Sequence, residues 1–338
     1  MKKKSIKNII DEYKVNNSCA MLYDLNKLKE NIHNIIYLKE KYNIEFIFPV
    51  KSFPNDKILR LFCDYGFGFD IANENEYILV KDIINDKTLL SFNGISMQTK
   101  KLKDNVIYNI NTLQDISKDY YNGVRINTYS NKKNEFSRFG ISLQKLYKIN
   151  VSNIKSISFH FYDENKIKKI KHIKKMLANC INIFPHLNYI NLGGNWNVID
   201  FKNFEKTIVK ARKFIDKNIK IIFEVGENWF DNCGYLITKV VGKNEIGNKK
   251  IIYINAVKDS VAKWSVLKPI NLNVGKHKND VYIISGNSCY EKDVFNVVRG
   301  EIDLSLNDKI VFIGLNGYSY AWCKEFNGSD VPEVIFYE

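Results

Sequence analysis

One pattern recurs eight times between residues 44 and 224: a short apolar run, a polar turn and, in most cases, a stretch with helical spacing. Apolar runs that are nearly continuous and alternate with helices are typical of parallel strands buried on both faces. Eight such units predict a (β/α)8 barrel, although periodicity alone leaves an open doubly wound sheet as the alternative. The predicted strands are residues 44–50, 66–71, 88–92, 106–110, 124–127, 157–160, 189–192 and 219–224.

The chain changes character near residues 231–234. Beyond this point, strand-like runs are separated by Gly, Asn and Asp, with little helical spacing between them. Such runs predict a β domain that follows the barrel. Its predicted strands are residues 235–241, 250–255, 281–285 and 309–313.

Several polar or small residues stand at the ends of the predicted barrel strands. Taken singly, a terminal lysine usually marks where a strand meets water, and a terminal histidine or glycine is usually structural. In a (β/α)8 barrel, however, the carboxyl ends of all strands meet at one rim, where active sites lie. Together these residues predict a rim site with a lysine nucleophile, a carboxylate and a notch of small residues. They are Lys51, Asp70, Arg125, His160, Gly193, Gly194 and Glu224.

The net charge of +14 is compatible with nucleic acid or with anionic substrates. The basic residues are spread along the chain, however, and no nucleic-acid-binding module is visible, so we expect no nucleic-acid partner. The longest basic stretch, KIKKIKHIKKM at residues 166–176, reads as the solvated face of an amphipathic helix. Frequent Lys, Ile and Asn together indicate a compositional bias of the source genome as the origin of the charge.

No apolar run approaches the length of a membrane span, and MKKKSIKNIIDEY at the N-terminus lacks the apolar core of a signal peptide. We therefore expect no membrane partner. The six cysteines show neither a pairing rhythm nor CxxC spacing. Their distribution favours a reduced, cytoplasmic protein over a disulfide framework or a metal site.

Seven short motifs follow one another between about residues 20 and 328. They are FPVKSFPNDKILRLFCDYGFGFDIANENE, VRIN with SRFGI, SFH, LGG, FEVGE, SGNSCYEKDVF and LNGYSYAWCKEFNG. In this order they resemble the pyridoxal 5'-phosphate (PLP) decarboxylases of fold type III, which include the ornithine and diaminopimelate decarboxylases. Each motif alone is a weak signal, whereas seven in the same order are a strong one.

The resemblance implies an alanine racemase-like fold. In this fold a PLP-binding (β/α)8 barrel would span residues 20–232, and residues 1–19 and 233–338 would form the β domain. It also implies a homodimer whose active sites are shared between subunits. The implied activity is that of a PLP-dependent carboxy-lyase, which removes the α-carboxylate of an amino acid. The amino-acid group could also be part of a larger molecule, with an anionic carrier as one option.

The resemblance also implies roles for the rim residues. Lys51 would hold PLP as a Schiff base, and Glu224 would favour protonation of the ring nitrogen. His160 would stack on the ring, while Gly193 and Gly194 would let backbone N–H groups approach the phosphate. The other cofactor-binding residues that the resemblance implies are Asp70, Arg125 and Tyr318.

The segment SGNSCY carries the implied proton donor and the substrate contacts. Cys289, supplied by the partner subunit, would protonate the product carbanion. The residue after this cysteine is acidic in family members that act on diamino acids, but here it is Tyr290, followed by Glu291. Unless Tyr290 is only interface packing, the substrate carries no distal amine or is an amino-acid group attached to a larger molecule.

Three positions depart from the family pattern. Asp163 replaces a phosphate-binding serine, Asn195 replaces the third glycine of the glycine motif, and Glu227 replaces an arginine. Two carboxylates near a phosphate would repel it, so a non-catalytic homologue with a binding or regulatory role stays an alternative. A racemase is less expected, because alanine racemases pair the ring nitrogen with an arginine in place of Glu224.

Overall fold

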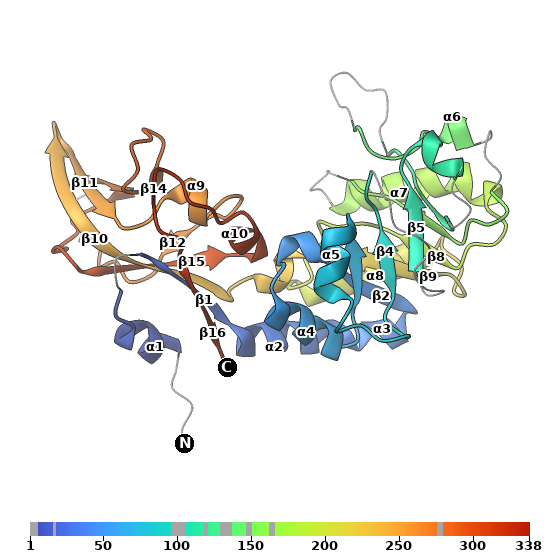
Figure 1. Cartoon of the computed structure of the whole chain (residues 1–338), viewed down its shortest axis with the longest axis horizontal. Helices are drawn as coiled ribbons and strands as arrows, with labels where there is room; N and C mark the ends of the chain where they lie inside the picture. Colours follow the sequence, from blue (N-terminus) through green and yellow to red (C-terminus); the bar gives the residue numbers. More distant parts are fainter. Residues whose placement is uncertain are drawn as a thin grey trace. The chain divides into compact units, whose positions relative to one another are not determined.

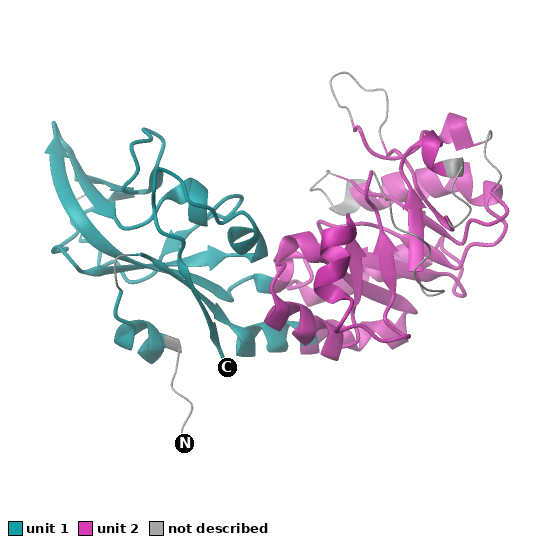
Figure 2. Ribbon diagram, in the orientation of Figure 1, with its two compact units in different colours: residues 1–32, 230–338 teal, residues 33–229 magenta. Residues whose placement is uncertain are grey.

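The computed structural model describes residues 6–15, 18–95, 106–117, 121–128, 137–146, 151–161, 166–275 and 280–338. The chain divides into two compact units (Figure 2). Unit 1 contains residues 1–32 and 230–338, and unit 2 contains residues 33–229. Helix α2 (Leu25–Ile36) includes the first junction between them.

Unit 2 contains a closed barrel of eight parallel strands, which confirms the predicted barrel (Figure 1). The strands follow one another around the barrel in chain order, and the last pairs with the first. They are β2 (Ile44–Pro49), β3 (Gly68–Ile71), β4 (Leu90–Phe92), β5 (Val106–Ile110), β6 (Gly123–Arg125), β7 (Ser156–Ser158), β8 (Tyr189–Asn191) and β9 (Lys220–Glu224).

Helices and short 3-10 turns connect the strands of the barrel. The longest helix is α7 (Lys166–Cys180), which precedes β8, and α8 (Phe201–Arg212) follows β8. The other helices are α3 (Leu38–Lys41), α4 (Asp56–Asp64), α5 (Glu74–Val80) and α6 (Leu143–Leu146), and the 3-10 turns are η1 (Val50–Ser52), η2 (Leu113–Ser117), η3 (Ile181–Ile183) and η4 (Glu227–Phe230).

The turn after β2 is braced by the helix that follows it. The Asn55 side chain accepts the backbone N–H of Lys57 and so caps the first turn of α4. The Phe62 ring of α4 stacks on the Phe48 ring of β2, with the ring centroids 4.0 Å apart. Apolar packing between strand and helix therefore fixes the direction in which the chain leaves the barrel at Lys51.

The register of the barrel brings two acidic strand ends beside β2. Pro49 pairs with Asp70 of β3, and Ile47 pairs with Glu224 of β9. Since parallel strands end at the same rim, the residues just beyond Pro49 lie between the two carboxyl side chains.

Unit 1 is a separate mixed sheet of eight strands, which confirms the predicted β domain. Its strands run in the order β12-β15-β10-β11-β13-β14, and β1 pairs with β10 and β16. They are β1 (Ala20–Asp24), β10 (Gly234–Ile246), β11 (Lys249–Ile254), β12 (Lys268–Pro269), β13 (Val281–Ser285), β14 (Val294–Arg299), β15 (Lys309–Leu315) and β16 (Glu333–Tyr337), with helices α1 (Ile6–Glu12), α9 (Lys258–Val261) and α10 (Gly317–Ala321).

The division expected from the sequence differs from the structure at its N-terminal side. We expected residues 20–32 to belong to the barrel, but they belong to unit 1. The reason is β1, which pairs antiparallel with β10 and parallel with β16. Its buried residues Ala20 and Leu22 pack with Ile10, and this cluster extends onto β10 and β15. The second junction lies at residues 229–230, against the expected 232–233. In the described part of the chain, no helix combines the length and the apolar character that crossing a membrane requires.

Candidate active site

Lys51 stands at the rim of the barrel, in the 3-10 turn η1 directly after β2. Its side chain is 49% exposed, and its Nζ lies 3.0 Å from Oδ2 of Asp70, whose side chain is buried. The Ser52 hydroxyl closes the same turn by donating to the Pro49 carbonyl over 2.8 Å. The turn thus holds an accessible amine against a buried carboxylate.

Asn93 joins the two acidic strand ends. It follows β4, and its Nδ2 donates to Oδ1 of Asp70 over 2.5 Å and to Oε1 of Glu224 over 3.2 Å. An amide between two carboxyl groups donates a hydrogen bond to each of them and reduces their mutual repulsion. Lys51, Asp70, Asn93 and Glu224 therefore form one continuous hydrogen-bonded chain.

Glu224 is buried at the end of β9, where its Oε1 also accepts from Nδ2 of Asn191 over 2.7 Å. Burial, and secondly the charge of Asp70, raise the pKa of the Glu224 carboxyl from 4.5 to about 7. Among the described residues, none donates to its second oxygen, Oε2. At neutral pH this group can consequently hold a proton and offer it to a bound ligand.

Asn191 extends the chain of hydrogen bonds to the glycine turn. Its Oδ1 accepts the backbone N–H of Gly193 over 2.9 Å. Gly193 has a φ of +68°, and a Cβ at this position would overlap the carbonyl oxygen of Phe159. A Cβ on Gly194 would lie 3.5 Å from Nε2 of His160 and 3.0 Å from the Glu224 carbonyl oxygen. This turn therefore leaves room only for backbone.

His160 lies beside the glycine turn, and burial lowers its pKa from 6.5 to about 4. The positive charges of Arg125, Lys51 and Lys169 act in the same direction. Arg125, at the end of β6, has its guanidinium carbon 4.6 Å from the centroid of the Phe139 ring. The imidazole is consequently neutral at physiological pH and presents an uncharged ring to the rim.

Of the three departures from the family pattern, Asp163 lies outside the described residues. Asn195 has a φ of +60°, a left-handed conformation that asparagine adopts more readily than most residues. Glu227 begins η4, three residues beyond the end of β9. An asparagine can thus keep the left-handed turn that a third glycine would provide.

The remaining predicted site residues belong to unit 1. Tyr318 lies in α10, and its ring packs edge-on against Trp264 with the centroids 5.3 Å apart. Cys289, Tyr290 and Glu291 are exposed in the turn between β13 and β14. They are therefore accessible on unit 1, and their roles stay predictions.

A buried carboxylate organises the turn that carries Cys289. Oδ2 of Asp293 accepts the Ser288 hydroxyl over 2.6 Å, and its Oδ1 accepts the Lys258 N–H over 2.8 Å. The Cys289 N–H donates to Oδ1 of Asn327 over 3.0 Å. This turn is thus fixed on both sides while the thiol remains exposed.

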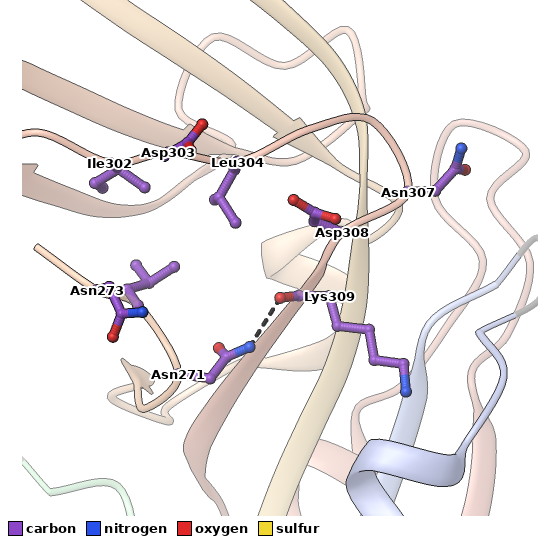
Figure 3. Close-up of a pocket in the computed structure, with 9 residues that line it drawn as sticks. Asn271, Asn273, Ile302, Asp303, Leu304, Asn307, Asp308 and Lys309 are labelled. Atoms are coloured by element: carbon purple, nitrogen blue, oxygen red, sulfur yellow. Dashed lines mark hydrogen bonds between the residues drawn. The ribbon is translucent and has the colours of Figure 1, made fainter.

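A hollow of about 460 Å³ in unit 1 is a weaker candidate (Figure 3). Its polar groups serve the surrounding backbone: Asn271 donates to the Lys309 carbonyl over 2.8 Å and accepts the Val311 N–H over 2.9 Å. Asp308 accepts the Ser305 N–H over 2.6 Å. We therefore place the candidate site at the barrel rim.

Sequence reasoning missed three rim residues, namely Asn93, Asn191 and Lys169. The two amides stand at strand ends, so the rim rule that selected Lys51 could have included them, but asparagine is too common in this chain to be distinctive. Lys169 belongs to the stretch that we expected to be a solvated helix face, and this expectation is wrong at that position. Lys169 is 1% exposed.

The rim offers a ligand three chemical groups. An amine beside a carboxylate can attack a carbonyl, a protonated carboxyl can pair with a basic nitrogen, and a turn of backbone N–H groups can bind an anion. Lys51, Glu224 and the Gly193–Gly194 turn provide these functions, and one network holds them in place.

No family model matches the chain. Curated relatives do match over most of its length. The carboxynorspermidine/carboxyspermidine decarboxylase of Campylobacter jejuni is 20% identical and aligns over 94% of this chain and 92% of its own. The diaminopimelate decarboxylase of Aquifex aeolicus is also 20% identical, over 90% of this chain and 83% of its own. The homologues are thus decarboxylases.

Solved structures share the whole fold. The C. jejuni carboxynorspermidine decarboxylase, complexed with norspermidine, superposes with a TM-score of 0.78 at 19% identity and covers 94% of both chains. The Paramecium bursaria Chlorella virus arginine decarboxylase, bound to agmatine, gives 0.79 at 18% identity over 98% of this chain and 99% of its own. A further neighbour, with a TM-score of 0.76 and 16% identity, was solved in complex with PLP. The fold is therefore that of the fold type III PLP-dependent decarboxylases.

Proposed function

We propose that this protein is a PLP-dependent decarboxylase. It removes the α-carboxylate of an amino acid or of an amino-acid group on a larger molecule. The observation that carries the proposal is the hydrogen-bonded chain that links Lys51 to Glu224 and to the glycine turn. The curated relatives also support it, because they are decarboxylases and align with nearly the whole chain.

The rim residues fit PLP. The Gly193–Gly194 turn excludes side chains and exposes backbone, as a phosphate site requires. Lys51 offers an accessible amine for the aldehyde, and Glu224 offers a carboxyl whose Oε2 is available for the ring nitrogen. When bound, PLP supplies an electron sink for the electron pair left by the departing carboxylate.

The protein contributes positioning at one atom and proton control at another. Asp70 Oδ2 lies 3.0 Å from Lys51 Nζ and holds in place the amine that can attack a carbonyl once it is deprotonated. Glu224, with a pKa of about 7, can share its proton with a basic ring nitrogen and keep that nitrogen positively charged. Asn93 donates hydrogen bonds to both Asp70 and Glu224, so it fixes the positions of these two carboxyl groups relative to each other.

His160 and Arg125 complete the barrel side of the site. A neutral imidazole beside the glycine turn offers a flat face to a cofactor ring without repelling its positive nitrogen. Arg125 adds a positive charge that acts on both His160 and Glu224. This surplus of positive charge favours an anionic ligand at the rim.

We also propose that the enzyme is a cytoplasmic homodimer, that Cys289 acts in the partner's site and that Tyr318 binds the cofactor. The exposed thiol stands in a turn that Asp293 and Asn327 hold in place, although it makes no contribution to the core of its own unit. An exposed, well-braced thiol suits a proton donor presented to another surface. All six cysteines are free, as a reducing compartment requires.

A non-catalytic homologue and a racemase remain the alternatives, but the rim favours neither. A non-catalytic binding protein would not need Lys51 and the protonated Glu224 carboxyl to be linked in one hydrogen-bond network. Glu224, an acid where alanine racemases use an arginine, favours a protonated ring nitrogen and therefore decarboxylation.

The substrate class follows from Tyr290, which is neutral and exposed beside Cys289. A charge-assisted hydrogen bond to a distal ammonium is worth about 1.5–3 kcal/mol, or roughly ten- to a hundredfold in kcat/KM. Free lysine, ornithine and diaminopimelate should therefore be poor substrates relative to an amino-acid group on a larger molecule. Carboxynorspermidine, the substrate named for the C. jejuni relative, is the first such compound to assay.

The test is CO2 release by PLP-loaded protein from a panel of these compounds. We expect release from at least one compound by the wild type, and none by Lys51→Ala. Release that persists in Lys51→Ala, or exchange between L and D forms without CO2, would contradict the proposed function. Efficient turnover of the diamino acids that Tyr290→Phe leaves unchanged would contradict only the substrate class.

A further inference from the structure

Lys169 is a buried lysine on α7, and it contacts the back of the glycine turn. Its Nζ donates to the Gly194 carbonyl over 2.6 Å and to the Asn195 carbonyl over 3.4 Å. The same Nζ lies 3.7 Å from the centroid of the Trp196 ring. A lysine is rarely buried unless its charge is satisfied, and two carbonyls with an aromatic face do so here.

These contacts set the direction of the turn's carbonyl groups. The Gly193 carbonyl accepts from Nε1 of Trp196 over 2.9 Å and from the Glu224 N–H over 3.0 Å. The Gly194 carbonyl is held by Lys169. In a trans peptide, the C=O of one residue and the N–H of the next point in opposite directions. The N–H groups of Asn195 and Trp196 therefore point away from Lys169. The N–H of Gly194 points away from the two groups that donate to the Gly193 carbonyl.

The turn has the backbone pattern of an anion-binding concavity. Gly193 and Asn195 both have positive φ, at +68° and +60°. Within the described residues, the N–H groups of Gly194, Asn195 and Trp196 donate to no protein acceptor. Three consecutive N–H groups without protein acceptors, held by carbonyls that point the other way, form a nest for an anion.

The charge of Lys169 reaches the rim as well. It acts on His160, whose Nε2 lies beside Gly194, together with Arg125 and Lys51. The turn consequently combines oriented N–H groups with a buried positive charge behind them. Both features favour a dianion over a neutral ligand.

We propose that Lys169 is a positioning residue for the phosphate of PLP. It orients the Gly194–Asn195 turn and supplies the buried charge that a phosphate dianion needs. The inference rests on the proposed function, because it names the device by which this chain holds the phosphate.

The test compares the affinity of the apo protein for PLP, for pyridoxal and for inorganic phosphate. Lys169→Met removes the charge and the hydrogen bonds, Lys169→Arg keeps a charge, and Lys174→Met removes an exposed lysine from the same helix. We expect Lys169→Met to weaken PLP binding at least tenfold and to abolish thermal stabilisation by phosphate. Pyridoxal, which lacks the phosphate, should bind with less than a twofold change. Lys169→Arg should recover part of the loss, and Lys174→Met should behave as the wild type.

If Lys169→Met does not fold, the same binding measurements are made on Trp196→Phe. It removes the Nε1 hydrogen bond to Gly193 and keeps an aromatic ring near Lys169. A selective loss of PLP affinity relative to pyridoxal would again support the inference. Equal effects on PLP and pyridoxal, or none on either, would overturn it while leaving the proposed function intact. A wild-type protein that binds no PLP would overturn both.

Discussion

At the scale of single residues, the site depends on a carboxyl that keeps its proton. Glu224 is buried beside Asp70, and two amide groups bind its Oε1. Deprotonation in this buried environment would place a second negative charge close to Asp70. The pKa of about 7 follows from that arrangement, and it gives the group a proton to share at physiological pH.

The raised pKa of Glu224 predicts a pH-dependent penalty on stability. In the unfolded chain the carboxyl ionises near pH 4.5, whereas in the folded apo protein it stays protonated up to about pH 7. Relative to the ionised form, the protonated Glu224 carboxyl therefore stabilises the folded protein fully below pH 4.5. This stabilisation is lost as the pH rises from 4.5 to 7, and it is absent above pH 7. Glu224→Gln does not ionise, so its unfolding free energy relative to the wild type should rise by about 2–3 kcal/mol across this range.

Urea unfolding of both apo proteins at pH 4.5, 6 and 8 measures this difference. Groups that titrate equally in the two proteins cancel. A difference that stays constant with pH would contradict the raised pKa, and so would one that falls.

The rim residues differ in how far the sequence reveals them. Lys51, Asp70 and Glu224 could be predicted because each is a charged residue at or next to the end of an apolar run, where the pattern marks a strand end. Asn93 lies in an equivalent position, but an amide carries no charge that would make it stand out. Lys169 could not be predicted, because the local helical pattern of lysines and isoleucines does not reveal which lysine the Trp196 ring and the turn carbonyls will bury.

At the scale of secondary structure, the turn after β8 is the most constrained element of the site. Gly193 combines a left-handed φ with a close approach to the Phe159 carbonyl oxygen. The strand pattern predicted where this turn lies. Its conformation could not be predicted, because it depends on contacts from α7, β9 and the loop after β7, which are distant in sequence.

A comparison of two glycines distinguishes the free-energy cost of steric overlap from that of a left-handed backbone conformation. Gly247, in the hairpin between β10 and β11, has a φ of +63°, and a Cβ there would meet nothing within 4 Å. Gly247→Ala should cost only the left-handed strain, about 1 kcal/mol in unfolding free energy. Gly193→Ala adds a steric overlap with backbone and should cost roughly 2–4 kcal/mol.

Thermal unfolding of the two variants and of the wild type decides this point. We expect Gly193→Ala also to lose PLP binding, while Gly247→Ala keeps it. Equal destabilisation by the two substitutions would mean that the turn is not as crowded as its geometry indicates.

At the scale of the whole molecule, the residues of unit 2 (33–229) lie between the two segments of the chain that form unit 1. The barrel could be predicted because each of its strands pairs with sequence neighbours, so a local repeat encodes the topology. The place of β1 could not, since AMLYD resembles a barrel strand and its partners β10 and β16 lie more than 200 residues away. Pairings this remote leave no local periodic signal.

The proposed homodimer predicts complementation between two inactive or impaired variants. Cys289→Ala should keep PLP binding but slow turnover, and Lys51→Ala should be inactive. In an equal mixture with free subunit exchange, half of the dimers are mixed and each contains one intact site, so activity should reach roughly a quarter of the wild-type value.

Exchange itself is followed by native mass spectrometry of subunits with different tags. A mixture that exchanges subunits but shows no more activity than the average of its two components would contradict the shared site. Cys289→Ala with full wild-type turnover would contradict the role of the thiol.

The central claim, that Lys51 carries PLP at the barrel rim, is tested most directly by mass spectrometry of PLP-loaded protein after borohydride reduction. Reduction fixes the cofactor to its lysine, and peptide mapping locates it. We expect a pyridoxyl group on the peptide that contains Lys51 and on no other lysine peptide. A pyridoxyl group on a different lysine, or none on folded protein incubated with PLP, would contradict the role of Lys51.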